Sequence, residues 1–140
     1  MSAEDTPMIT TVLSIGGHGF SADDLTSLLG VQPTKVWRRP EKLDWLKAAD
    51  PDLASMEWRY IMEKQRKWSF GEAIDEVLNV FWSKRAELNE FLTRNNLGLH
   101  VRCRPFGDAS KLEYIIQPEV LKKLAELSAS LSLAIYKDEL

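Results

Sequence analysis

The chain contains little of what a disulfide or a metal site needs. Among its 140 residues there is one cysteine, Cys103, and there are two histidines, His18 and His100. A single thiol forms no internal disulfide, and these three side chains are too few for a structural zinc site. The sequence therefore predicts no metal, and its cysteine usage fits a protein of the reducing cytosol.

Long hydrophobic runs are also lacking. No window of about 18 apolar residues occurs, so no membrane-spanning helix is expected. The start, MSAEDTPMITTVLSIGG, carries Glu4 and Asp5 and lacks the basic region and the apolar stretch of a secretory signal. Residues 137–140 spell KDEL, a retention signal that is read only after entry into the secretory pathway. We interpret this KDEL as coincidental and expect a cytoplasmic protein.

An excess of positive charge is absent as well. The chain has 18 Lys and Arg residues against 21 Asp and Glu residues, which gives a net charge of -3. Indiscriminate binding to nucleic acid relies on excess Lys and Arg, so no nucleic-acid partner is expected. The composition, 44% hydrophobic and without a low-complexity tract, indicates one globular domain over residues 1–140. Residues 1–7 are expected to be disordered, and residues 137–140 to form a solvated tail.

The chemical motifs in the sequence are weak. Residues 17–22, GHGFSA, match G-x-G-x-x-A in outline, but Asp23 and Asp24 lie where a dinucleotide pyrophosphate needs the positive end of a helix. Cys103 and His100 are three residues apart, which places them on opposite faces of a strand and prevents a nucleophile–base pair. The sequence therefore predicts no cofactor and no catalytic residue, and it leaves open whether the protein is an enzyme.

Hydrophobic periodicity and capping residues predict an α+β fold. Ser21 is expected to cap a short helix that ends at Gly30. Ser69 is expected to cap a long helix that breaks near Ser83, and Pro118 is expected to begin a third helix. The expected strands are the following: residues 8–15, 31–39, 57–64, 99–105, 112–117 and 131–135. The resulting order, β-α-β-β-α-β-β-α-β, is typical of a split βαβ (ferredoxin-like) arrangement with a mostly antiparallel sheet and helices on one face.

Tryptophan and arginine supply the candidate site. The chain has five tryptophans, and the steps Trp37-Arg38 and Trp58-Arg59 repeat on two expected strands. One interpretation is core packing with surface arginines. The other is a basic sheet face that holds an acidic partner or an anionic ligand. The candidate binding residues on this second interpretation are Trp37, Arg38, Arg39, Trp58, Arg59, His100, Arg102 and Arg104.

A stretch near the start resembles a known signature. FSADDLTSLLGVQPTKVWRR is similar to F-S/T-x-D/E-x-L-T-x-L-L-G-x-x-P-T-x-x-W-R, which marks a bacterial family of domains of unknown function. Trp58 and the stretch from Pro118 to Tyr136 match further parts of that pattern, so nearly the whole chain is covered. Pro40 and Ala134 depart from it. The resemblance implies a small uncharacterised cytosolic α/β domain, and it transfers no catalytic residues.

Two functions of different classes follow. The first is a non-catalytic protein-binding module of the immunity or toxin-neutralising type, because Trp and Arg are enriched at protein interfaces. The second is a sensor or enzyme for a small anionic molecule that uses the Trp and Arg cluster. A protein-binding face is expected to be broad and flat, whereas a ligand site is concave with convergent polar groups. Homodimerisation through a sheet edge stays open.

Overall fold

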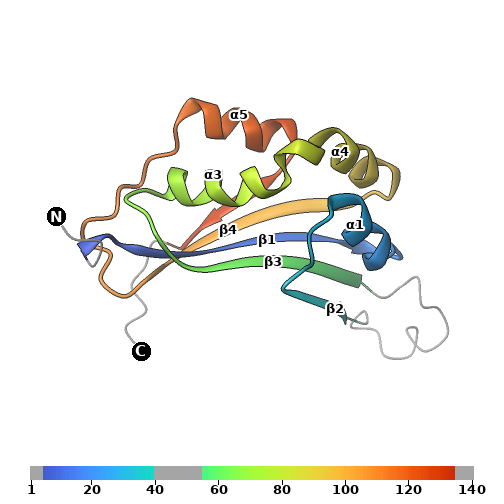
Figure 1. The fold of residues 1–140 in the computed structure, drawn as a ribbon, viewed down its shortest axis with the longest axis horizontal. Helices are drawn as coiled ribbons and strands as arrows, with labels where there is room; N and C mark the ends of the chain where they lie inside the picture. The colour runs from blue at the N-terminus through green and yellow to red at the C-terminus, as the bar shows by residue number, and fades with distance from the viewer. Residues whose placement is uncertain (1–4, 40–54, 135–140) are drawn as a thin grey trace.

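The computed structural model describes residues 5–39 and 55–134, which form one five-stranded sheet with helices packed on it (Figure 1). The strands are β1 (Met8–His18), β2 (Lys35–Arg39), β3 (Ser55–Arg66), β4 (Gly98–Phe106) and β5 (Ser130–Leu133). The helices are α1 (Ala22–Leu29), α3 (Phe70–Phe81), α4 (Arg85–Arg94) and α5 (Pro118–Glu126), with the 3-10 turn η3 (Trp82–Lys84) between α3 and α4. The predicted α+β class is confirmed. The tail expected for residues 137–140 lies outside the described residues, as do residues 1–4 of the stretch that was expected to be disordered.

The sheet is mixed, with the strand order β2-β3-β1-β4-β5. The pairs β2 with β3, β3 with β1 and β1 with β4 are antiparallel, whereas β5 pairs in parallel with β4. The expectation of a mostly antiparallel sheet is therefore wrong. Its physical reason is α5, because a helical crossover between β4 and β5 returns the chain in the same direction, as a hairpin does not.

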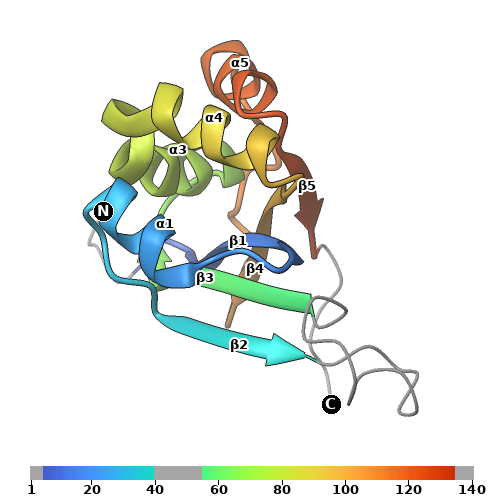
Figure 2. The same ribbon diagram turned by 90° about the vertical axis from the view of Figure 1, so that its right-hand side faces the viewer.

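The helices α1, α3, α4 and α5 of the described residues lie on one side of the sheet (Figure 2). Along β1 the odd-numbered residues from Ile9 to Ile15 are buried, and the apolar ones among them pack with the apolar stripe of α3. This alternation follows from the pleat of a strand, which sends successive side chains to opposite faces. Within residues 5–39 and 55–134, no helix has the length and apolar character needed to cross a membrane.

The capping residues act as predicted. The Ser21 hydroxyl accepts a hydrogen bond from the backbone N–H of Asp24 at 3.1 Å, and Gly30 ends α1 with a φ of 69°. The Ser69 hydroxyl accepts from the N–H of Glu72 at 3.2 Å at the start of α3. The expected break near Ser83 is confirmed as η3.

Residues 112–117 do not form the expected strand. Instead of a strand pairing, this segment has an isolated β-bridge between Glu113 and Ser69, and its carbonyls accept hydrogen bonds from the start of α3. The first N–H groups of that helix, on Phe70 and Gly71, donate to the carbonyls of Glu113 and Ile115 at 3.2 and 2.9 Å. A helix leaves its first N–H groups without partners inside the helix, so this segment caps α3 from outside.

A β-bulge in β3 changes which side chains face the helices. The pairing with β1 shifts between Ile9 and Thr11, and Lys64 has a φ of 53° at the bulge. Gln65 therefore turns toward the helices and is buried. Its amide nitrogen donates to the carbonyl of Ala73 at 3.1 Å and to Glu76 at 2.9 Å, and its amide oxygen accepts from Thr11 at 2.6 Å. This amide joins the sheet to α3.

Candidate functional site: the uncovered face of the sheet

The second face of the sheet carries the even-numbered side chains of β1, and no described helix packs on it. One cross-strand row on this face contains a residue from every strand. In order across the sheet the row is Lys35, Arg59, Ser14, His100 and Ser130. Residues in direct register share a face and lie close enough to interact, so the register brings together polar side chains that are far apart in the sequence.

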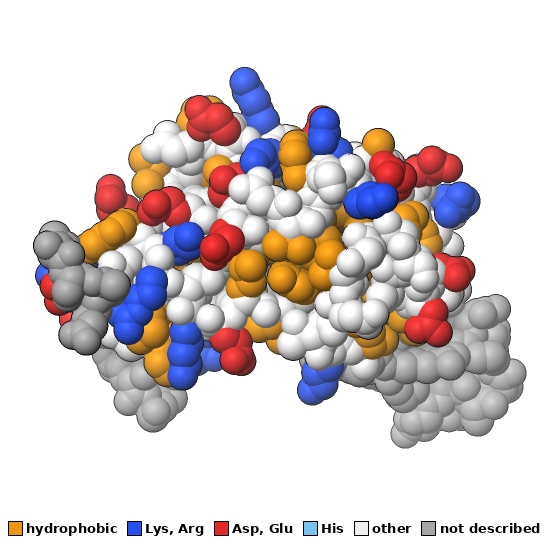
Figure 3. Space-filling model, viewed as in Figure 1, with side chains coloured by type: hydrophobic (Ala, Val, Ile, Leu, Met, Phe, Trp, Pro, Cys, Tyr) orange, Lys and Arg blue, Asp and Glu red, His pale blue; other side chains and the backbone are white. Residues whose placement is uncertain are grey.

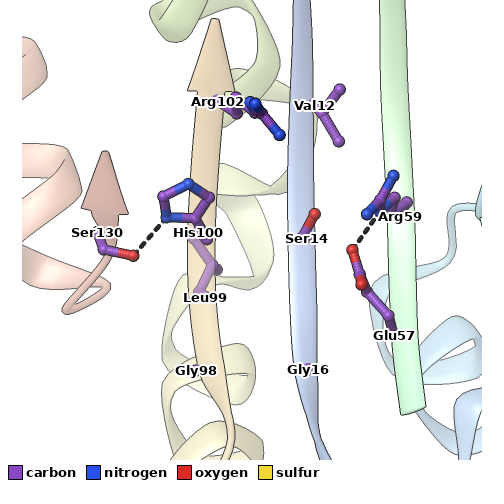
Figure 4. A pocket seen from close by; sticks show the side chains of 10 residues that line it. All are labelled: Val12, Ser14, Gly16, Glu57, Arg59, Gly98, Leu99, His100, Arg102 and Ser130. Atoms are coloured by element: carbon purple, nitrogen blue, oxygen red, sulfur yellow. Dashed lines mark hydrogen bonds and ion pairs between the residues drawn. The ribbon is translucent and has the colours of Figure 1, made fainter. Parts of the chain in front are cut away.

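A hollow of about 380 Å³ lies on this face over β1 (Figure 4). Its floor has small residues, Ser14 and Gly16 of β1 and Gly98 of β4, between longer side chains of β3 and β4. Neighbouring strands are about 5 Å apart, so side chains on β3 and β4 form walls about 10 Å apart. The complete lining is Val12, Ser14, Gly16, Glu57, Arg59, Gly98, Leu99, His100, Arg102 and Ser130.

A second hollow, of about 540 Å³, follows the first along β1. It is lined by Thr10, Glu63, Lys64, Arg104, Pro105, Phe106 and Gly107. Thr10 lies two residues before Val12, and both share the face of Ser14 because side chains alternate along a strand. We call the two hollows together the β1 trough, with Thr10, Val12, Ser14 and Gly16 along its floor.

Arginines line the trough on both sides. On β3 the Arg59 guanidinium forms an ion pair with Glu57, so much of its charge is balanced within the site. On β4 the exposed Arg102 makes no hydrogen bond or ion pair with any described residue. A guanidinium carries five N–H donors in a planar fork, which suits a carboxylate or phosphate oxygen pair. Arg102 is therefore the side chain best able to bind an anionic group here.

His100 is held on the β4 wall by two serines of β5. Its Nδ1 lies 2.6 Å from the Ser130 hydroxyl, and its Nε2 lies 2.9 Å from the Ser132 hydroxyl. A hydroxyl both donates and accepts, so either charge state of the ring is satisfied by this pair. The serines fix the imidazole plane beside the trough, and Ser130 adds its own hydroxyl to the lining.

The structure brings some predicted residues together and separates others. Arg59, His100 and Arg102 line the first hollow, and Arg104 lines the second. Trp58 instead lies in the core, where its Nε1 donates to the Thr26 hydroxyl at 3.0 Å and its ring packs edge-on against Phe81.

The remaining three predicted residues, Trp37, Arg38 and Arg39, lie on β2. Their backbones pair with Glu57, Met56 and Ser55 respectively, whereas Trp58 pairs with Val36. The Trp-Arg steps of β2 and β3 are therefore out of register by one residue. The two repeated dipeptides are therefore not paired with each other in the sheet.

The site residues that sequence reasoning missed have only a weak signal in the sequence. Ser14 follows from the alternation of β1, which places it opposite the buried Leu13 and Ile15. Ser130 and Ser132 alternate with Leu131 and Leu133 on β5, which is the pattern of a strand with one apolar face. Their proximity to His100 depends on the parallel pairing with β4, and that pairing was not predicted.

The buried thiol is separate from this site. Cys103 faces the helices and contacts the Thr11 hydroxyl at 3.7 Å, while His100 lies on the other face of the same strand. Burial raises the pKa of the Cys103 thiol from its usual 9.0 to about 11, and the contact with Thr11 offsets this only in part. The described residues also contain no group of three His, Cys, Asp or Glu side chains arranged to hold a metal ion.

Comparison with known proteins gives one family. No curated protein and no solved structure shows detectable similarity to the chain. A family model matches residues 8–138, from the start of β1 to beyond β5, and so includes the whole uncovered face. The chain belongs to the family described as Domain of unknown function (DUF4279).

Proposed function

We propose that this domain is a non-catalytic module that recognises another protein through the uncovered face of its sheet. The observation that carries the proposal is the row His100, Arg102 and Arg104 on β4, beside a trough with a floor of small side chains. We call these three residues the basic row. Arginine is enriched among the residues that dominate protein interfaces, and Arg102 has no described partner to compete with an incoming carboxylate.

The helix side of the molecule is a weaker candidate. In the upper part of Figure 3, where the helices lie, Lys and Arg side chains are interspersed with Asp and Glu side chains. The helices also carry exposed ion pairs, such as Arg94 with Glu90 on α4 and Arg85 of α4 with Glu126 of α5. Such a mixed surface is typical of a solvated face.

The chemistry of the site also favours binding over catalysis. The Cys103 thiol is buried and its raised pKa keeps it protonated at neutral pH. Ser130 and Ser132 contact His100, but β4 pairs with β1 and β5 on its two sides. The backbone N–H groups near the imidazole are thus engaged in the sheet, where an acyl-transfer site needs donors for an oxyanion.

The test is a comparison of Arg102→Gln with Arg94→Gln as bait proteins in the native cytosol. Arg94 is an exposed arginine on α4, in the helix layer, and serves as the matched control. A partner should be retained by the wild type and by Arg94→Gln and lost with Arg102→Gln. If Arg102→Gln retained every stoichiometric partner, the uncovered face would not be the surface that binds them.

A small anionic ligand is the second candidate, and the concavity of the first hollow favours it. Its volume of about 380 Å³ is in the range of small-molecule sites, and guanidinium, imidazole and hydroxyl groups converge on it. Equilibrium dialysis with anionic metabolites tests this candidate. It would be supported if metabolite binding depended on Arg102 and the capture of protein partners did not.

Two finer interpretations accompany the proposal. The connection of β1 through α1 to β2, with β3 between them, supports a split βαβ, ferredoxin-like description of the first part of the sheet. Origin from a bacterium, a cytosolic location and a toxin-neutralising role rest on the resemblance of the sequence signature. Inhibition of a partner enzyme by the purified domain would test the last of these.

A further inference from the structure

We propose that the β1 trough binds an extended acidic segment of the partner, with carboxylates at every second residue. This inference rests on the proposed function and gives the chemistry of the protein that the uncovered face recognises. It follows from the spacing of the basic row, the shape of the trough and the difference in charge between its two walls.

The spacing of the basic row is that of a β-strand. His100, Arg102 and Arg104 occupy alternate positions of β4 and lie in register with Ser14, Val12 and Thr10 on the floor of the trough. Each residue of a strand rises about 3.3 Å, so the three side chains leave the sheet about 7 Å apart. A second extended chain presents its own alternate side chains at the same interval. Carboxylates at every second position of such a chain can therefore face Arg102 and Arg104 in turn, and the next position borders the His100 ring and the hydroxyls of Ser130 and Ser132 that hold it.

The trough has room for such a chain beside β4. Its floor side chains from Thr10 to Gly16 are small or absent except for Val12 and extend over about 20 Å by strand geometry. Seven residues of an extended segment span this length. Beyond Thr10 the Lys64 ammonium lies 4.6 Å from the centre of the Phe106 ring, and this contact between β3 and β4 ends the trough. Val12 and Ile61 are direct neighbours in register on this face and supply an apolar contact midway along it.

The two walls differ in charge, which distinguishes a peptide from a polyphosphate. The β4 wall carries the basic row, whereas the β3 wall carries Glu57 and Glu63 together with Arg59 and Lys64. A nucleic-acid strand has a charge on every unit and would approach both carboxylates. An extended peptide can direct its acids toward β4 and neutral or basic residues toward β3. Like charges across an interface are costly, so the peptide is the better fit.

The experiment is a titration of the 15N-labelled protein with two peptides of equal composition and charge. One alternates, Ser-Glu-Ser-Glu-Ser-Glu-Ser, and the other groups its acids, Ser-Ser-Glu-Glu-Glu-Ser-Ser. At low salt we expect the alternating peptide to bind about tenfold more tightly, with the largest amide shifts at Ser14, His100, Arg102 and Arg104. Arg102→Gln should weaken this binding about tenfold, because one of the two guanidinium contacts of the basic row is lost. Arg94→Gln should leave it unchanged.

Three outcomes would overturn the inference. Equal affinity for the two peptides would mean that charge alone determines binding. Tighter binding of a seven-nucleotide oligothymidylate than of the alternating peptide would make the trough a site for polyphosphate. Binding that Arg102→Gln and Arg94→Gln weaken equally would place the contact away from the basic row.

Failure of this inference is distinguishable from failure of the proposed function. A partner captured through Arg102 should be displaced by the alternating peptide and retained in the presence of the grouped one. If both peptides fail to displace an Arg102-dependent partner, the protein-binding function stands and the acidic segment is wrong. If the alternating peptide binds at the basic row but every captured protein is also retained by Arg102→Gln, the site chemistry stands and the proposed function is wrong.

Discussion

Ser14 of β1 is the direct cross-strand neighbour of His100 of β4, and the difference in size between these two side chains creates one wall of the trough. On its other side Ser14 faces Arg59 of β3. A single small residue between two long ones thus determines whether this face is hollow or flat. Its side chain is only partly buried and belongs to no described core cluster, so the position can be changed without disturbing the core.

Ser14→Tyr should therefore fill the trough and leave the fold intact. We expect partner binding to fall at least tenfold, while the free energy of unfolding changes by less than about 1 kcal/mol, because tyrosine is favoured on a partly exposed strand. Binding and urea unfolding of the same preparation measure the two effects. Ser27→Tyr, at an exposed position on α1, should leave binding at the wild-type level. Unchanged binding by Ser14→Tyr would show that the partner does not enter the trough.

Gln65→Leu should destabilise the domain by roughly 1–3 kcal/mol, the usual range when buried polar groups lose a hydrogen-bond partner. The change leaves the Thr11 hydroxyl without its acceptor at 2.6 Å and the Ala73 carbonyl without its donor at 3.1 Å. Urea unfolding measures the loss. Gln32→Leu in the exposed connection before β2 is the control and should change stability by less than about 0.5 kcal/mol. Equal effects of the two variants would mean that the buried amide does not tie the sheet to α3.

Cys103 should make stability fall as the pH rises from 9 to 11. Its pKa is raised from 9.0 to about 11 in the folded state, so the unfolded chain releases the thiol proton first. The contribution is fully present below pH 9 and is lost as the pH passes through 11, with a magnitude of about 2–3 kcal/mol. Comparing unfolding at pH 8 and pH 10.5 for wild type and Cys103→Ala isolates this group from the lysines and tyrosines. An identical pH dependence in the two proteins would contradict the assignment.

Gly71→Ala should destabilise the protein although alanine is the better helix former. A Cβ atom at position 71 would lie 2.8 Å from the carbonyl oxygen of Ile115, which belongs to the backbone and cannot rotate away. We expect the free energy of unfolding to fall by at least about 1 kcal/mol, whereas alanine at an unobstructed helical site would raise it by about 1 kcal/mol. Thermal unfolding should show a lower midpoint than for Gly98→Ala, because a Cβ at position 98 meets no atom within 4 Å. A raised midpoint for Gly71→Ala would mean that residues 112–117 are not fixed against α3.

The sequence predicts those parts of the fold that local chemistry controls. Ser21, Gly30 and Ser69 act at helix ends through hydrogen bonds and backbone angles that depend on their immediate neighbours. The alternation of β1 depends on burial of one face and was visible for the same reason. These features need only a few adjacent residues, so one sequence is enough to identify them.

The parts that were missed depend on distant segments. Residues 112–117 have the apolar character of a strand, yet their carbonyls bind the start of α3, more than 40 residues earlier in the chain. The parallel position of β5 beside β4 likewise depends on how α5 crosses the sheet. Trp82, at the junction of α3 and α4, is only partly buried. The Arg85 guanidinium and the Lys123 ammonium lie 5.0 and 5.2 Å from its ring centre.

The candidate site follows the same division. Arg102 and Arg104 share a face with His100 because the three residues occupy alternate positions of one strand. Neighbouring positions in the sequence are enough to predict this. Arg59 and Arg102 lie on either side of Ser14 because the strand order is β3-β1-β4. The one-residue offset between Trp37 and Trp58 depends on the register of β2 with β3. Neither can be read from composition or spacing.

The alternation of β1 separates two functions of one strand, because its two sets of side chains lie on opposite faces of the sheet. Its odd positions, including Leu13 and Ile15, determine whether the chain folds, and its even positions, including Val12 and Ser14, determine what the uncovered face can touch. Substitutions at the even positions can therefore accumulate with little effect on stability. A library varied at positions 12, 14, 100 and 102 would yield many specificities on one unchanged scaffold, so this sheet is a suitable starting point for engineering new binding proteins.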